Sequence, residues 1–264
     1  MSMTTPYFGI VTDYGNATGW TADDDPCHRL IMHTFPTRVK IMLAVIAAGG
    51  FTHACASEDP IEDQLVYAYE LFLLENPSDP LSAELWQKLG NIYLHQGHYD
   101  DARKAYGNVI RLAVESPDHD SPERLAAELG IGLSLSAERR FDEAVVQLRK
   151  AADNASSADV SKNMISVYRE LTSIGLRTDD YVLSFEYASH AQKIYKTLGY
   201  LNDEADMLLV MGVSSAQQGN MQQARELLKK SFHILTEIDN ATSIEQASRV
   251  VKIANEFGID SSAW

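Results

Sequence analysis

The sequence predicts an all-α fold of about four stacked helical hairpins, with a leading helix before them and a capping helix at the C-terminal end. The stretch at 83–110 shows two short helical patterns joined by the turn Gln96-Gly97-His98. Similar pairs of patterns recur about every 40 residues. The chain has 264 residues, of which 45% are hydrophobic and 22% charged, so it can bury a sizeable core.

The first hairpin carries the most informative motif. Its helices contain the spacing W-x2-L-G-x2-Y and then four further small or aromatic residues: Trp86, Leu89, Gly90 and Tyr93, followed by Gly97, Tyr99, Ala102 and Tyr106. Gly90 and Ala102 are small where paired helices must approach closely, and the large residues fill the space around them. This motif resembles the tetratricopeptide repeat. The resemblance covers residues 61–257 and implies a right-handed α-solenoid that binds proteins or peptides without catalysis.

Four hairpins are expected, at residues 83–116, 122–155, 159–199 and 202–238. Gly132 and Gly212 occupy the position of Gly90 in the second and fourth hairpins. The third hairpin has Thr172 there, so its assignment depends mostly on its second helix. The capping helix, at 243–257, carries an apolar stripe and is followed by a tail at 258–264. The stripe consists of Ile244, Ala247, Val250, Val251, Ala254 and Phe257.

The leading helix occupies part of residues 61–80. It places Leu65, Ala68, Tyr69 and Phe72 on one stripe and should end at Asn76-Pro77, because proline disfavours the α conformation in the residue before it. A helix of this kind before a repeat resembles the tetratricopeptide lipoproteins of the Gram-negative cell envelope.

The N-terminal region has the pattern of an export signal. Residues 32–56 run from a basic stretch through the apolar segment 41–51 to small residues, and the apolar segment is too short to span a bilayer. If this signal is real, residues 1–31 are unstructured sequence upstream of the true start codon, and 57–60 form a tether.

Two kinds of processing fit the end of the signal. Ala54-Cys55-Ala56 matches a cleavage site before Ser57, whereas Ala54-Cys55 resembles a lipobox in which Cys55 is lipidated. The protein would then be exported to the cell envelope, with Cys55 as its only membrane anchor. An ordinary buried N-terminal helix is the alternative, and the protein would then be cytoplasmic.

Composition excludes several classes of function. The formal net charge of −15 argues against a nucleic-acid surface, which needs clustered Lys and Arg. Two cysteines are too few for a disulfide framework. No nucleotide-binding or hydrolase motif is found, and no catalytic residue or cofactor is assigned.

Two pairs of polar residues near the first turn are candidates for chemistry. His95 and His98 lie near Asp100 and Asp101, but no further ligands with zinc-like spacing accompany them, so no metal site is assigned. A hydrolase or phosphatase that uses these acidic residues is the catalytic alternative.

The expected functional surface is a concave groove lined by the first helix of each hairpin. Helical periodicity assigns nine residues to it: Gln87, Asn91, His95, Leu129, Leu133, Arg169, Ser173, Leu209 and Val213. Such a mixed groove suits an amphipathic helix or an extended segment of a protein partner. The alternative is that its Leu and Val residues belong to the core between helices. The predicted function is therefore an interaction scaffold at the cell envelope, with a cytoplasmic regulator that senses a peptide or partner protein as the alternative.

Overall fold

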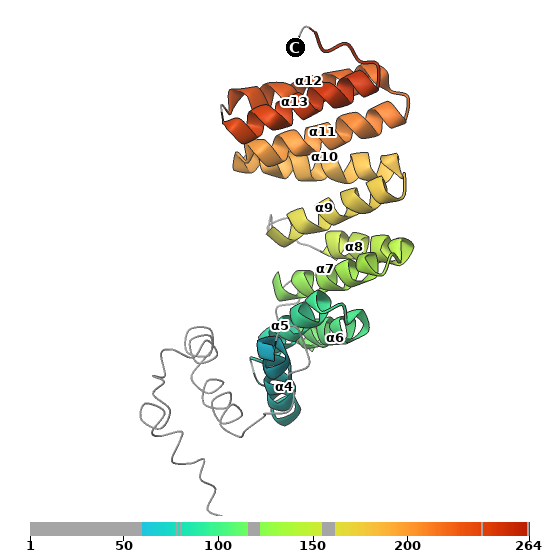
Figure 1. The fold of residues 1–264 in the computed structure, drawn as a ribbon. Helices are drawn as coiled ribbons and strands as arrows, with labels where there is room; N and C mark the ends of the chain where they lie inside the picture. The colour runs from blue at the N-terminus through green and yellow to red at the C-terminus, as the bar shows by residue number, and fades with distance from the viewer. Residues whose placement is uncertain are drawn as a thin grey trace, which may run out of the picture. The chain divides into compact units, whose positions relative to one another are not determined.

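The computed structural model describes residues 60–77, 79, 81–115, 122–154, 162–238, 240–262 and 264. The predictions for 1–31, for the signal at 32–56 with Cys55, and for the tether up to residue 59 lie outside these residues. Every element in the described ranges is an α-helix, which confirms the predicted all-α repeat fold (Figure 1).

The chain divides into two compact units, Met1–Ile92 and Tyr93–Trp264. The described part of the first unit contains α4 (Pro60–Glu75) and most of α5 (Ser82–His95). Helix α4 buries Ala68, Tyr69 and Phe72, three of the four stripe residues that the sequence predicts. The helix ends before Pro77, and the Ser82 hydroxyl donates a hydrogen bond of 2.7 Å to the carbonyl of Asn76.

The second unit is a stack of helices in chain order. From α6 (green) to α13 (red), each helix contacts the next along the stack (Figure 1). The helices are α6 (Tyr99–Glu115), α7 (Pro122–Ala137), α8 (Phe141–Asn154), α9 (Lys162–Arg177), α10 (Tyr181–Leu198), α11 (Leu201–Gln217), α12 (Met221–Glu237) and α13 (Ala241–Glu256). The third hairpin, α9 and α10, is complete despite Thr172.

Glycine allows the closest approach between paired helices. A Cβ atom at Gly132 would collide with the Leu148 side chain, and one at Gly212 would lie 2.7 Å from Leu228. The equivalent positions of the third hairpin, 40 residues along, hold Thr172 and Ala188, both buried. The larger residue on α9 is thus accompanied by a smaller one on α10, which keeps the helices close.

The turns inside the hairpins of the second unit share one backbone conformation. Gly97, Arg139, Asp179 and Gly219 all have positive φ, at 77°, 63°, 57° and 81°. In three of these turns the next amide donates to the carbonyl five residues earlier, as in Arg140 N to Leu135 O at 2.9 Å. This is the hydrogen bond of a left-handed helix cap, which reverses the chain in few residues.

The core runs through the middle of the second unit. One cluster joins buried residues of α7, α8, α9 and α10, including Leu148, Leu171 and Leu183. A second joins α11, α12 and α13 with Ile259 of the tail, and Trp264 packs against it. On α13, Ala247, Val250 and Ala254 of the predicted apolar stripe are buried. Ile244, which the sequence places on the same buried side, is exposed, so that prediction is wrong.

Ile244 is 54% exposed because α13 packs mainly against α12 and only slightly against α11. The apolar stripe is therefore wider than the surface that the helix covers. Within the described ranges, none of the helices is long and apolar enough to cross a membrane.

Candidate functional site

The candidate site is the face formed by α7, α9 and α11, the first helices of three successive hairpins. Residues 129, 169 and 209 are 40 positions apart, and so are 133, 173 and 213. Equal spacing in repeats of equal length places each trio at equivalent positions of the three helices. We call these six positions the first-helix face.

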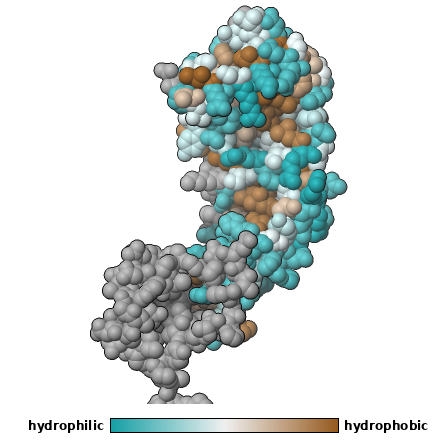
Figure 2. Space-filling view, viewed as in Figure 1, coloured by the Kyte–Doolittle hydropathy of each residue, from teal (hydrophilic) through white to brown (hydrophobic). Residues whose placement is uncertain are grey.

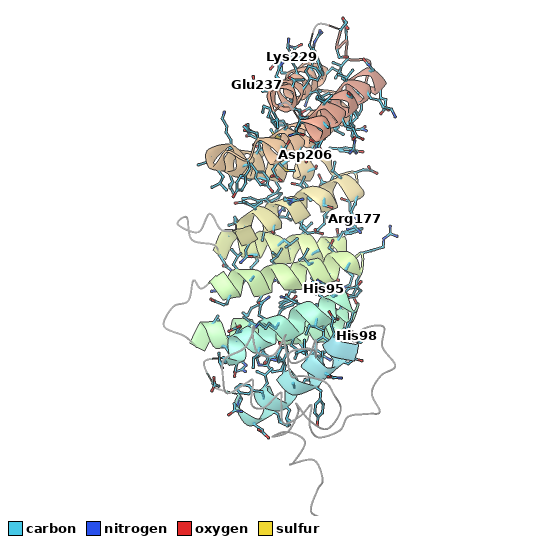
Figure 3. All side chains as sticks on the ribbon, turned by 60° about the vertical axis from the view of Figure 1, so that its left-hand side comes forward. His95, His98, Arg177, Asp206, Lys229 and Glu237 are labelled. Atoms are coloured by element: carbon cyan, nitrogen blue, oxygen red, sulfur yellow. The ribbon has the colours of Figure 1, made fainter. Side chains whose placement is uncertain are left out.

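The residues predicted on α5 are divided between the two units. Gln87 and Asn91 belong to the first unit, where the Gln87 amide donates to Asn91 Oδ1 at 3.3 Å. His95 ends α5 in the second unit and is exposed (Figure 3).

Leu129 is a core residue. It is 8% exposed and belongs to the cluster of α7, α8, α9 and α10, as the alternative interpretation expects. Leu133, one turn further along α7, is partly buried and packs against the same cluster. On α7, only Leu133 is exposed enough to contact a partner, because Leu129 is part of the core.

The α9 and α11 parts of the face remain more accessible. Arg169 is exposed, whereas Ser173, Leu209 and Val213 are partly buried. Apolar side chains form separate patches between polar ones on the visible surface of the second unit (Figure 2). The face can therefore offer both apolar contact and charge to a partner.

Sequence reasoning missed Asp206, which lies three residues before Leu209 on α11 (Figure 3). Burial and then the neighbouring charge of Asp203 raise the pKa of the Asp206 carboxyl, although Arg169 and Arg249 act in the opposite direction. The i, i+3 spacing from Leu209 could have placed Asp206 on the same stripe.

Polar contacts fix the hairpins against one another at their turns. Arg103 on α6 forms an ion pair of 2.7 Å with Glu138 of the next hairpin. Arg177, labelled in Figure 3, lies 4.5 Å from the centre of the Phe141 ring, and the Gln218 amide donates to the Tyr181 carbonyl at 3.0 Å. These contacts position the helices that carry the face and leave the face itself free of them.

Asp100 and Asp101, the acidic residues of the catalytic alternative, form ion pairs at the surface. Asp100 pairs with Arg103, and Asp101 accepts a hydrogen bond of 2.7 Å from Lys104, which lowers the pKa of the Asp101 carboxyl. His98 lies with its ring centre 6.2 Å from that of Tyr93. No group of three or more metal-binding side chains occurs within the described part of the chain.

Known proteins define the class of this fold. The chain is an all-α repeat protein whose architecture matches solved helical solenoids. It has 16% identity to BtubC (BKLC) from P. vanneervenii, covering 89% of this chain and 93% of that one, with a TM-score of 0.58. It has 10% identity to the apo form of RapI, covering 97% and 76%, with a TM-score of 0.63.

One part of the sequence also matches a family model. Residues 81–157 match the tetratricopeptide repeat family, and this stretch contains the motif around Trp86. A Rap protein in complex with Competence and Sporulation Factor is also similar, with 14% identity, a TM-score of 0.53 and coverage of 95% of this chain and 66% of that one. None of the curated proteins matches the sequence.

Proposed function

We propose that this protein is a non-catalytic scaffold that binds a segment of a protein or peptide on its first-helix face. The observation that carries the proposal is the partly exposed row of Leu133, Ser173 and Val213 on the first helices of three successive hairpins. The row combines apolar and polar side chains on rigid elements, which suits recognition of an amphipathic helix or an extended segment. A similar fold in the Rap protein carries a bound factor, which supports the same use of the fold here.

The experiment compares two valine substitutions. Val213→Asp places a charge on the face, and Val146→Asp makes the same change on α8, where Val146 is 70% exposed. Each variant is expressed at native level, crosslinked in cells and purified, and the partners are identified by mass spectrometry. We expect the wild type and Val146→Asp to retain the same partner and Val213→Asp to lose it.

Circular dichroism provides the control for folding. All three proteins should show the same helicity, because Val213 lies at the edge of the core and not within it. Retention of the partner by a folded Val213→Asp variant would contradict binding at this face.

We further propose that the scaffold acts at the cell envelope, anchored through Cys55. The support is the order of basic, apolar and small residues in 32–56. Labelling with palmitate should mark the wild type and not Cys55→Ser. Label in both proteins, or in neither, would instead favour the second candidate, a cytoplasmic regulator that uses the same face.

A further inference from the structure

One carboxylate lies next to the first-helix face on α11, in line with two apolar residues of that face. Asp206, Leu209 and Val213 follow one another at spacings of three and four residues on α11, so their side chains share one side of the helix. All three are partly buried, and Leu209 packs against the core of α11, α12 and α13. The stripe therefore consists of one charged residue, Asp206, followed by two apolar residues, Leu209 and Val213.

Among the described residues, Asp206 takes part in no ion pair within 4.0 Å. Arg169 from α9 and Arg249 from α13 attract its charge from further away, while Asp203 on its own helix repels it. The raised pKa shows that the two arginines do not offset burial and repulsion.

The two arginines that attract Asp206 lie on other helices. Arg169 is on α9 and Arg249 is on α13, and neither forms an ion pair with Asp206 within 4.0 Å. Bringing either arginine into contact with Asp206 would restrict a long side chain, which costs conformational entropy. A cation brought in by a partner would face a carboxylate that is already partly desolvated.

We propose that the segment bound on the first-helix face carries an arginine or lysine side chain that pairs with Asp206, followed by apolar residues that pack on Leu209 and Val213. The inference rests on the proposed function, and it specifies the kind of side chains that the bound segment carries. Charge complementarity supports it at two scales, because the formal net charge of −15 also attracts a basic segment from solution. Asp206 is then the residue that selects the partner.

Two pools of short synthetic peptides test this. Each pool has randomised apolar and neutral flanks, and the central residue is arginine in one pool and citrulline, its uncharged analogue of the same shape, in the other. Binding to the full chain is measured by fluorescence anisotropy. We expect the arginine pool to bind about tenfold more tightly, as one partly buried charged pair supplies.

Matched Asp→Asn variants locate the effect. Asp206→Asn should abolish the preference for arginine, whereas Asp142→Asn, the same change on the exposed side of α8, should keep it. Equal binding of the two pools by the wild type, or a preference that survives in Asp206→Asn, would overturn the inference while leaving peptide binding intact. Failure of both pools to bind the wild type would overturn the inference and the proposed function together.

Discussion

At the scale of single residues, Arg139 adopts a conformation that suits glycine. Its φ of 63° lies in the left-handed region, where Gly97 and Gly219 occupy the equivalent turns. We expect Arg139→Gly to raise the free energy of unfolding by about 1 kcal/mol, because glycine has no Cβ to clash there. Urea denaturation measures the change. Gly219→Ala is the control and should lower stability by a similar amount, and a loss of stability in Arg139→Gly would contradict the prediction.

Glu128 is a buried carboxylate whose replacement should stabilise the protein. It is 1% exposed, and its Oε1 is 3.4 Å from Arg124 Nε and 3.1 Å from Asn154 Nδ2, whereas its Oε2 has no hydrogen-bond partner among the described residues. The third and fourth hairpins have Tyr168 and Leu208 at this position. Because a desolvated, half-satisfied charge is costly, Glu128→Leu should raise the free energy of unfolding by roughly 1–2 kcal/mol.

Thermal unfolding followed by circular dichroism checks the Glu128 prediction. The partly exposed partners, Arg124 and Asn154, can turn to water after the substitution. A lower melting temperature in Glu128→Leu would show instead that the carboxylate holds α7 and α8 together.

Asp206 gives a pH dependence with a definite sign. Its pKa is raised in the folded protein, so the folded state favours the protonated form and the ionised form costs stability above that pKa. Asp206→Asn should therefore stabilise the protein at neutral pH, and the gain should disappear as the pH falls below the ordinary aspartate value of about 3.9. Chemical denaturation at a series of pH values measures this, and a gain that grows in acid would contradict it.

Helical periodicity predicts the side of a helix that a residue occupies, but it does not predict burial. Leu129 and Arg169 occupy equivalent positions, and only Arg169 is exposed. Burial depends on the neighbouring helices, which a single sequence does not reveal. Asp206 was missed because its partial burial, which is the main reason for its raised pKa, depends on neighbouring helices in the same way.

At the scale of helices, replacing two glycines with alanine should change the stability of the protein in opposite directions. A Cβ at Gly175 on α9 would lie 2.6 Å from the backbone nitrogen of Ser184 and 2.9 Å from the Asp180 carbonyl, whereas a Cβ at Gly107 on α6 would meet nothing within 4 Å. Gly175→Ala should destabilise by about 1–3 kcal/mol, since backbone cannot move aside. Gly107→Ala should stabilise by about 0.5–1 kcal/mol through helix propensity.

Urea denaturation of the two alanine variants tests this contrast within one experiment. Equal effects of the two substitutions would mean that the close approach of α9 to α10 is not what limits residue 175.

The helices themselves were largely predictable, and the reason is local. Small residues such as Gly132 and Gly212, and turn residues such as Gly219, act within one hairpin and leave a sequence signal. The third hairpin was harder because Thr172 breaks the pattern, and its compensation by Ala188 is visible only when the two helices are seen together.

At the scale of the whole chain, the excess of acidic residues should make stability depend on salt. A formal net charge of −15 repels itself in the folded state. Raising the ionic strength from about 0.01 to 0.15 M shortens the screening length from roughly 30 to 8 Å. We expect the melting temperature measured by circular dichroism to rise with NaCl. A fall would mean that local pairs such as Arg103–Glu138 outweigh the overall repulsion.

The constant interval between equivalent positions in α7 through α12 has a practical result for engineering. Helices α8, α10 and α12 begin at residues 141, 181 and 221, so a cut at matching points of two hairpins rejoins the chain in register. Excising residues 141–180 would bring Tyr181 into the place of Phe141 and leave a stack that is one hairpin shorter. Helix α7 would then pair with α10, and Gly132 would meet Ala188 instead of Leu148, so this one new interface would need a larger residue at 188. The number of hairpins can therefore be changed in units of 40 residues at the cost of adjusting one interface.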